Sequence, residues 1–314
     1  MPDEPIVSTP PDPVEGPVDG PPPPLPSPRP DPPKPYPGFW QAIGLFALYT
    51  LFQVLFIIPF GVSDYFWPRN LSKHPALYGV VVLASGALVI RFARRRLSVP
   101  LRQIAGPLVP PLIFFWTAGI VFGLLLSEMP VLLWISRRFP SLIPQSNLGL
   151  ENSLWGAVLL AVIAAPLIEE TIFRGIFLRG FIPRYGTMWG IVAGAALFGA
   201  AHLSLLRLVP TVSLGLLLGW LYSRTRSIWP GVLGHAVNNS FAALAVFAKP
   251  PSSGTRDLGH FTWAEPAFVL VGAGLMVYGI SSLRLIFAEF DMESANKASA
   301  IMEDQHEQIQ DREP

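Results

Sequence analysis

The amino-acid sequence predicts an all-α protein, a polytopic bundle of about eight transmembrane helices preceded by a disordered, proline-rich amino-terminal tail. Three observations lead to this prediction. Hydrophobic residues make up 51% of the 314 residues and charged residues only 14%, whereas soluble domains carry about 25% charged residues. Apolar stretches long enough to cross a hydrocarbon core recur along the chain. The prolines concentrate at its beginning, where residues 1–38 hold 17 of the 35.

The proline-rich segment 1–38 also carries six acids and two bases, and it has almost no large apolar side chain before Tyr36. Such a segment has nothing to bury, so it stays disordered or extended in the polyproline II form. We interpret it as a flexible tether rather than as a docking arm for a proline-binding partner.

After Gly38, eight apolar stretches predict the helices of a membrane domain at 39–288. Their expected ranges are 39–60, 76–92, 109–127, 153–183, 187–204, 208–222, 229–248 and 266–288. Residues 289–314 carry eight acids and two bases. We therefore expect the last helix to end near residue 288 and to continue as a solvated acidic tail.

Basic residues divide unequally between the two sides of the predicted bundle. With a cytoplasmic amino terminus, 15 of the 22 lysines and arginines fall on the inside, including the cluster RFARRR at 91–96. The positive-inside rule then predicts that both termini are cytoplasmic, and we expect the membrane to be the plasma membrane of a bacterium.

The net charge of +1 gives no indication of a nucleic-acid partner. The absence of cysteine excludes disulfides, thiolate metal sites and cysteine nucleophiles.

Polar residues cluster within three of the apolar segments. Glu169, Glu170 and Arg174 lie in 153–183, His202 lies in 187–204, and His235 with Asn239 lies in 229–248. Ionisable groups inside a membrane are costly and usually functional. A chance gathering of packing residues explains this set less well than a reaction site does.

Helical spacing separates the two adjacent acids. Glu170 and Arg174 are four residues apart in the order that favours an ion pair on one face, while Glu169 projects about 100° away. The sequence therefore predicts a supporting role for Glu170 and Arg174, and it leaves Glu169 for another partner.

A tight turn at 184–186 predicts an antiparallel helical hairpin. Two residues on its opposite arms lie at the same depth in the membrane when their numbers add up to about 371. This arithmetic pairs Glu169 with His202 and Phe173 with Phe198. A carboxylate and an imidazole at one depth can hold and deprotonate a water molecule, or bind a metal.

His235 and Asn239 are four residues apart and share a helix face. Their N–H groups are suitable donors to a developing oxyanion. Glu169, His202 and His235 together also resemble a catalytic zinc set, so zinc is a candidate cofactor. We favour a metal-independent reaction, because the donors of Asn239 suit an anion better than a cation.

At these positions the sequence resembles the CPBP intramembrane proteases, the CAAX-protease and bacteriocin-processing family that includes the eukaryotic type II CAAX prenyl endopeptidases. Three family motifs occur in order within residues 153–245. They are EExxxR at Glu169–Arg174, FxxxH at Phe198–His202 and HxxxN at His235–Asn239. The resemblance implies an intramembrane endopeptidase whose substrate is a peptide or protein, lipidated or membrane-bound.

The resemblance also implies roles for individual residues. Glu169 and His202 would activate the attacking water, and His235 and Asn239 would stabilise the oxyanion. Glu170, Arg174 and Phe198 would support them. The family has been described both with and without a metal, so a metalloendopeptidase remains open at this point.

Two other functions compete with peptide hydrolysis. The chain could be a non-catalytic membrane scaffold or a bacteriocin self-immunity protein that keeps the same fold. It could also be a transporter in which Glu and His form a proton path, although the apolar segments show none of the two-half symmetry that many transporters have.

Overall fold

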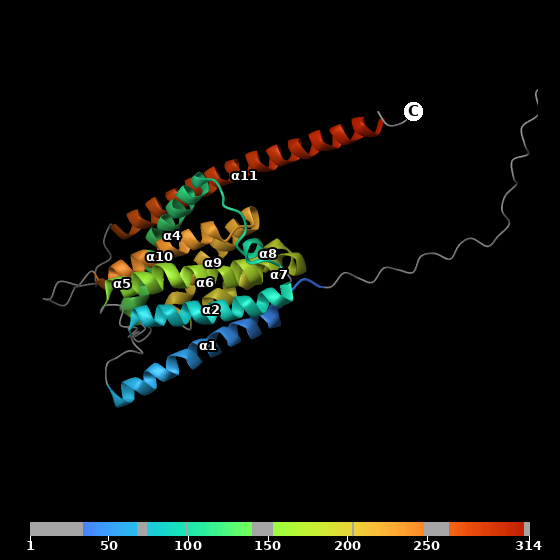
Figure 1. Ribbon diagram of the computed structural model, residues 1–314. Coiled ribbons are helices and arrows are strands. Elements are labelled where there is room, and N and C mark those ends of the chain that lie inside the picture. The colour runs from blue at the N-terminus through green and yellow to red at the C-terminus, as the bar shows by residue number, and fades with distance from the viewer. Residues whose placement is uncertain are drawn as a thin grey trace, which may run out of the picture. The chain divides into compact units, whose positions relative to one another are not determined.

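The computed structural model describes residues 34–67, 74–97, 99–139, 153–202, 204–247 and 264–310. Helices account for nearly all of these residues, and no strand occurs among them, so the predicted all-α class is confirmed (Figure 1). Residues 1–33, which make up most of the expected proline-rich tail, lie outside the described residues.

Each of the eight expected helices is present, and one short helix was not expected. The helices are α1 (Phe39–Phe66), α2 (Pro75–Leu97), the short α3 (Leu101–Ala105), α4 (Pro111–Arg138), a composite helix from Leu154 to Tyr185, α8 (Thr187–Ala201), α9 (Leu205–Thr225), α10 (Trp229–Phe247) and α11 (Ala264–Gln310).

Six of these helices are long and apolar enough to cross a membrane, namely α1, α2, α4, the composite helix, α9 and α11. The apolar helix α8 has only 15 residues, or about 22 Å at 1.5 Å per residue, which is less than the hydrocarbon thickness. Large apolar side chains such as Phe115, Leu270 and Val277 are exposed on α4 and α11. An apolar surface of this kind suits lipid, and the protein is an integral membrane protein.

The composite helix lies at the centre of the bundle. It consists of α5 (Leu154–Ala157), the π-helical turn η4 (Val158–Ala164), α6 (Ala165–Glu170), the π-helical turn η5 (Thr171–Leu178) and α7 (Arg179–Tyr185). Of the most apolar 18-residue stretch of this helix, 56% is buried inside the protein, whereas only 11% of the corresponding stretch of α1 is buried. Helices α2, α8 and α10 pack against it, so the polar residues of the composite helix face protein rather than lipid.

The π-helical turn η4 leaves one backbone carbonyl without a partner in its own helix. The N–H of Ala165 bonds the carbonyl of Leu160, five residues back. In this register the next N–H would bond the carbonyl of Ala161, but residue 166 is proline and has no N–H. The carbonyl of Ala161 is therefore left without a partner from its own helix.

Both ends of the expected helical domain need correction. The tail was expected to extend to residue 38, but Tyr36 packs against the core, and residues from Pro35 onward cluster with the helical unit. The backbone N–H of Phe39 donates to the hydroxyl of Tyr185 at 3.0 Å. These contacts with α7 order the segment just before α1, which composition alone does not reveal.

The expected end of the last helix near residue 288 is wrong, because α11 continues to Gln310. Residues 289–310 contain no glycine or proline, and they are rich in the helix-favouring residues Ala, Glu, Met and Gln. Arg224 of α9 also pairs with Asp291 at 2.7 Å. Acidic composition predicted solvation, but it does not stop a helix.

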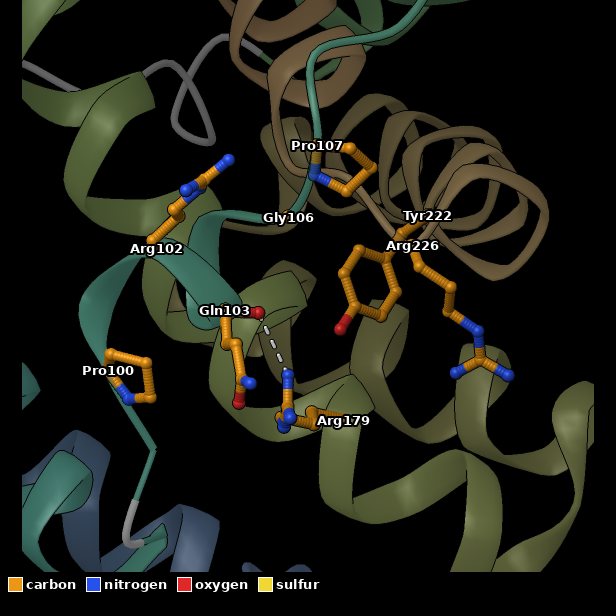
Figure 2. Close-up of a pocket in the computed structure, with 8 residues that line it drawn as sticks. All are labelled: Pro100, Arg102, Gln103, Gly106, Pro107, Arg179, Tyr222 and Arg226. Atoms are coloured by element: carbon orange, nitrogen blue, oxygen red, sulfur yellow. Dashed lines mark hydrogen bonds between the residues drawn. The ribbon is translucent and has the colours of Figure 1, made fainter.

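One end of the bundle collects arginines from several segments, and we call it the arginine end. Here α2 and α7 end with Arg94, Arg95, Arg96 and Arg184. The turn between α9 and α10 also lies here, and its Ile228 N–H donates to the carbonyl of Ala105 in α3 at 3.0 Å. This bond brings α3 beside the turn, around a pocket at the arginine end (Figure 2).

Candidate active site

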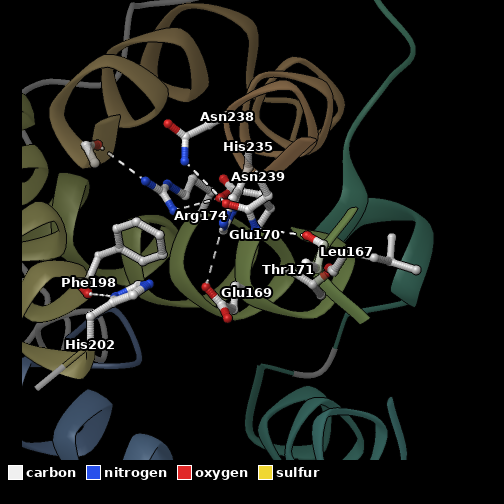
Figure 3. A network of polar contacts seen from close by, with 12 residues as sticks. Leu167, Glu169, Glu170, Thr171, Arg174, Phe198, His202, His235, Asn238 and Asn239 are labelled. Carbon is white, nitrogen blue, oxygen red and sulfur yellow. Dashed lines mark hydrogen bonds and ion pairs between the residues drawn. The ribbon is translucent and has the colours of Figure 1, made fainter. Parts of the chain in front are cut away.

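Glu170 lies at the centre of the polar network in the bundle (Figure 3). Its Oε1 accepts a hydrogen bond from Nη1 of Arg174 at 2.8 Å and lies 3.0 Å from Nδ1 of His235. The side chains of Glu170 and Arg174 are 0% and 2% exposed. The predicted ion pair is therefore confirmed, and a histidine from α10 joins it.

Arg174 has two further partners in the core. Its Nη2 donates to the carbonyl of Gly215 in α9 at 3.3 Å. Its guanidinium carbon lies 4.6 Å from the centre of the Phe198 ring, within the range of a cation–π interaction. A buried cation needs partners on several sides, and here α6, α8 and α9 each contribute one.

Glu169 has a different environment from its neighbour, as the helical spacing predicted. Its Oε2 lies 3.9 Å from Nε2 of His235, and its side chain is 22% exposed. It also interacts electrostatically with Tyr49 of α1 and Tyr78 of α2. Glu169 is thus the more exposed of the two carboxylates, whereas Glu170 is buried in the core.

The predicted hairpin is only partly confirmed. Gly186, with φ of 82°, forms the turn between α7 and α8, and the rings of Phe173 and Phe198 pack 5.2 Å apart as expected. No hydrogen bond or ion pair joins Glu169 to His202 among the described residues. Sequence arithmetic sets the depth of a residue in a hairpin, but it does not set the direction in which the side chain points.

His202 directly follows the last residue of α8. Its Nδ1 lies 2.9 Å from the carbonyl of Phe198. The Phe198 ring contacts two imidazoles, with centre-to-centre distances of 5.0 Å to His202 and 5.5 Å to His235. The phenylalanine of the FxxxH motif therefore packs edge-on against both histidines.

Asn239 contacts the composite helix. Its Nδ2 donates to the carbonyl of Ala161 at 2.8 Å, the group that η4 and Pro166 leave without a helical partner. Its Oδ1 accepts from Nδ2 of Asn238 at 3.2 Å. One N–H of the Asn239 amide remains after these bonds.

The zinc hypothesis finds no preformed ligand set in this structure. Within the described part of the chain, no three His, Asp or Glu side chains form a group that could hold a metal ion. Glu169 and His235 approach each other, but His202 does not join them. The present arrangement of these three residues therefore does not fit a tetrahedral zinc site.

Sequence reasoning missed the role of two glycines. A Cβ atom on Gly231 of α10 would lie 2.6 Å from Oε2 of Glu170, so glycine at this position lets α10 bring His235 to the acid. Gly215 supplies its carbonyl to Arg174. Both glycines stand out in the sequence as small residues that permit close packing, but this pattern does not identify their partners.

Comparisons with known proteins agree with the resemblance. Residues 151–241 match the family model described as Rce1-like, type II CAAX prenyl endopeptidase. "Putative membrane peptidase YdiL" of Bacillus subtilis (strain 168) is 26% identical over 87 residues, which are 28% of this chain and 36% of that protein. The match thus spans about a third of that relative. No solved structure matches the chain.

Proposed function

Because residues 151–241 match the family model described as Rce1-like, type II CAAX prenyl endopeptidase, we propose that the protein hydrolyses peptide bonds within the membrane, using a water molecule activated by Glu169. One observation carries this proposal. His235 lies between two carboxylates, 3.0 Å from the sealed Glu170 and 3.9 Å from the accessible Glu169.

Glu169 is the general base in this mechanism. It is the more exposed of the two acids, so a water molecule can reach its carboxylate. Its separation of 3.9 Å from Nε2 of His235 is too long for a direct hydrogen bond. A water molecule that both groups contact would lose its proton to Glu169 as it attacks the peptide carbonyl.

His235 is the proposed hydrogen-bond donor to the oxyanion, and the charge of its imidazole decides whether Nε2 can donate. Glu170 is paired with Arg174 as a carboxylate, so it accepts a hydrogen bond from an N–H at Nδ1 of His235. To donate from Nε2 as well, the imidazole must carry both protons. In that state the set of two carboxylates, one guanidinium and one imidazolium is neutral, which suits a buried site.

His202 and Asn239 complete the proposed site. When Nδ1 of His202 donates to the Phe198 carbonyl, Nε2 is an acceptor and can receive a hydrogen bond from the attacking water. The remaining N–H of Asn239 can donate to the oxyanion beside His235. The roles implied by the three motifs are thus compatible with the hydrogen bonds of each side chain.

The proposed substrate is a peptide or protein held at the membrane, with a lipid-modified CAAX-type carboxyl terminus as the first candidate. The support is the description of the matched family and the position of the site inside an apolar bundle. A lipid anchor concentrates its substrate in the membrane, and the proposed site with Glu169 also lies there.

The test is a cleavage assay with purified protein in lipid nanodiscs and fluorogenic peptides, with and without a prenyl group. We expect cleavage by the wild type and loss of at least about 100-fold in Glu169→Gln, as is typical when general-base catalysis is removed. Glu128→Gln is the matched control, because Glu128 is a half-buried acid of α4 outside the polar network. Full activity of Glu169→Gln would overturn the mechanism. Absence of cleavage of every peptide by the wild type would favour a binding role.

A further inference from the structure

A pocket lined by arginines lies at the arginine end, and none of its lining residues belongs to the proposed peptidase site. Figure 2 shows three arginines and a tyrosine around it. Its volume is about 810 Å³. The lining residues are Pro100, Arg102, Gln103, Gly106, Pro107, Arg179, Tyr222 and Arg226. None of these eight residues is acidic, so the pocket carries an excess of positive charge.

The arginines of this pocket keep hydrogen-bond donors available. Nη1 of Arg179 donates to the carbonyl of Gln103 at 2.9 Å, which leaves its other N–H groups free for a ligand. The guanidinium groups of Arg102 and Arg226 make no hydrogen bond or ion pair with the described residues. Tyr222 lines the same pocket and contributes a hydroxyl group. Planar guanidinium groups beside a hydroxyl are well suited to bind phosphate oxygens.

The backbone around the pocket is held in a defined shape. Gly106 has a φ of 76°, and a Cβ atom there would collide with the carbonyl of Arg226. The bond from the Ile228 N–H to the Ala105 carbonyl fixes the same junction. The pocket is therefore built at a close contact between α3 and the α9–α10 turn, and it is not a chance gap between surface side chains.

Arg226 itself adopts a strained conformation. It caps α9 with φ of 52° and ψ of 26°, in the left-handed region. Helices that end in this way usually have glycine at the position, since a side chain is unfavourable there. Backbone strain of this kind tends to occur at functional sites, and here it is tolerated at a residue that lines the pocket.

The pocket lies where α9 ends and beside the first residue of α7, Arg179, and the ends of membrane-spanning helices are where lipid head groups are met. Basic pockets between transmembrane helices bind acidic head groups. We propose that this pocket binds a phosphate group, in the first place the phosphodiester of an anionic phospholipid. Arg179 lies ten residues beyond Glu169 on the composite helix, so a bound lipid would contact the helix that carries the proposed base.

The experiment measures binding rather than cleavage, so its outcome does not depend on the proposed peptidase activity. Delipidated protein in a nonionic detergent is titrated calorimetrically with short-chain phosphatidylglycerol, with short-chain phosphatidylcholine and with inorganic phosphate. We expect saturable binding of phosphatidylglycerol and much weaker binding of phosphatidylcholine. Binding of inorganic phosphate without phosphatidylglycerol would identify the free ion as the ligand of the same pocket.

Arg226→Gly is the decisive variant, because it removes the guanidinium and also relieves the backbone strain. We expect its affinity to fall at least tenfold while its melting temperature stays the same or rises. Arg102→Gln in α3 should weaken binding to a similar extent, so it tests the same pocket from a second helix. Arg94→Gln, at the arginine end but outside the pocket, is the matched control. Equal affinity of the wild type and both pocket variants would overturn the proposal.

Discussion

The Nδ1 atom of His235 and the Oε1 atom of Glu170 lie 3.0 Å apart, and the same oxygen accepts the hydrogen bond of Arg174. This contact joins α10 to the composite helix across 65 residues of sequence. It fixes one ring nitrogen of His235 as a donor to Glu170 and directs the other toward Glu169. The supporting pair of charges thereby orients a proposed catalytic side chain, and this leads to separable predictions for the two acids.

Removing one partner of the buried pair should destabilise the protein. In Arg174→Ala and in Glu170→Ala the remaining charge stays in the core without its counter-ion. We expect a loss of about 3–5 kcal/mol in the free energy of unfolding, measured by thermal or denaturant unfolding in detergent. Glu169→Ala is the control and should unfold like the wild type, because Glu169 is partly exposed. If all three variants were equally stable, the central role of the pair would be wrong.

Gly231→Ala should damage both stability and activity. The added methyl group would lie 2.6 Å from Oε2 of Glu170, so either this carboxylate or α10 must shift, and both shifts disturb the contact between Glu170 and His235. We expect a lower melting temperature and at least tenfold slower cleavage. Gly274→Ala in α11 is the matched control, since a Cβ atom there has no neighbour within 4 Å. It should leave both measurements unchanged or raise stability slightly. Wild-type behaviour of Gly231→Ala would contradict the observed packing of α10.

Asn239→Ala should leave the partly buried carbonyl of Ala161 without its donor. Losing a hydrogen bond of this kind costs about 0.5–1.5 kcal/mol, and we expect a decrease of that size in unfolding free energy in addition to any loss of cleavage. Asn238→Ala removes a neighbouring amide but keeps the bond from Asn239 to Ala161, so its effect on stability should be smaller. An unchanged stability of Asn239→Ala would show that this hydrogen bond contributes little.

Dialysis against a strong chelator should leave cleavage intact, because Glu169, His202 and His235 do not converge as a ligand set. Activity and metal content would be measured on the same sample. The opposite result would make the protein a metalloendopeptidase. That result is loss of activity, restoration by one equivalent of zinc, and failure of His235→Ala to bind the metal.

The division of basic residues predicts the orientation in the membrane. A reporter fused after Arg96 should be cytoplasmic, since the cluster at 91–96 follows the positive-inside rule. A reporter fused near Ser252 should be on the other side, and accessibility to a membrane-impermeant label measures both. The reverse pattern would also reverse the side on which the arginine end lies.

The sequence by itself determined the features that depend on neighbours along one helix or across one turn. Long apolar stretches identified eight helices, and spacing of four residues predicted the pair of Glu170 and Arg174. The turn at Gly186 predicted the contact of Phe173 with Phe198. These features follow from the helical period and the length of a turn, which are the same wherever the helix lies in the bundle.

Tertiary structure decided which faces of distant helices meet. It brought His235 to Glu170 rather than leaving that acid with Arg174 alone, and it placed no direct bond between Glu169 and His202. It also gave Asn239 a partner in the carbonyl of Ala161. Each of these contacts depends on the rotation and close approach of helices separated by tens of residues. Such rotations are set by packing at glycines such as Gly231, and no local period in the sequence encodes them.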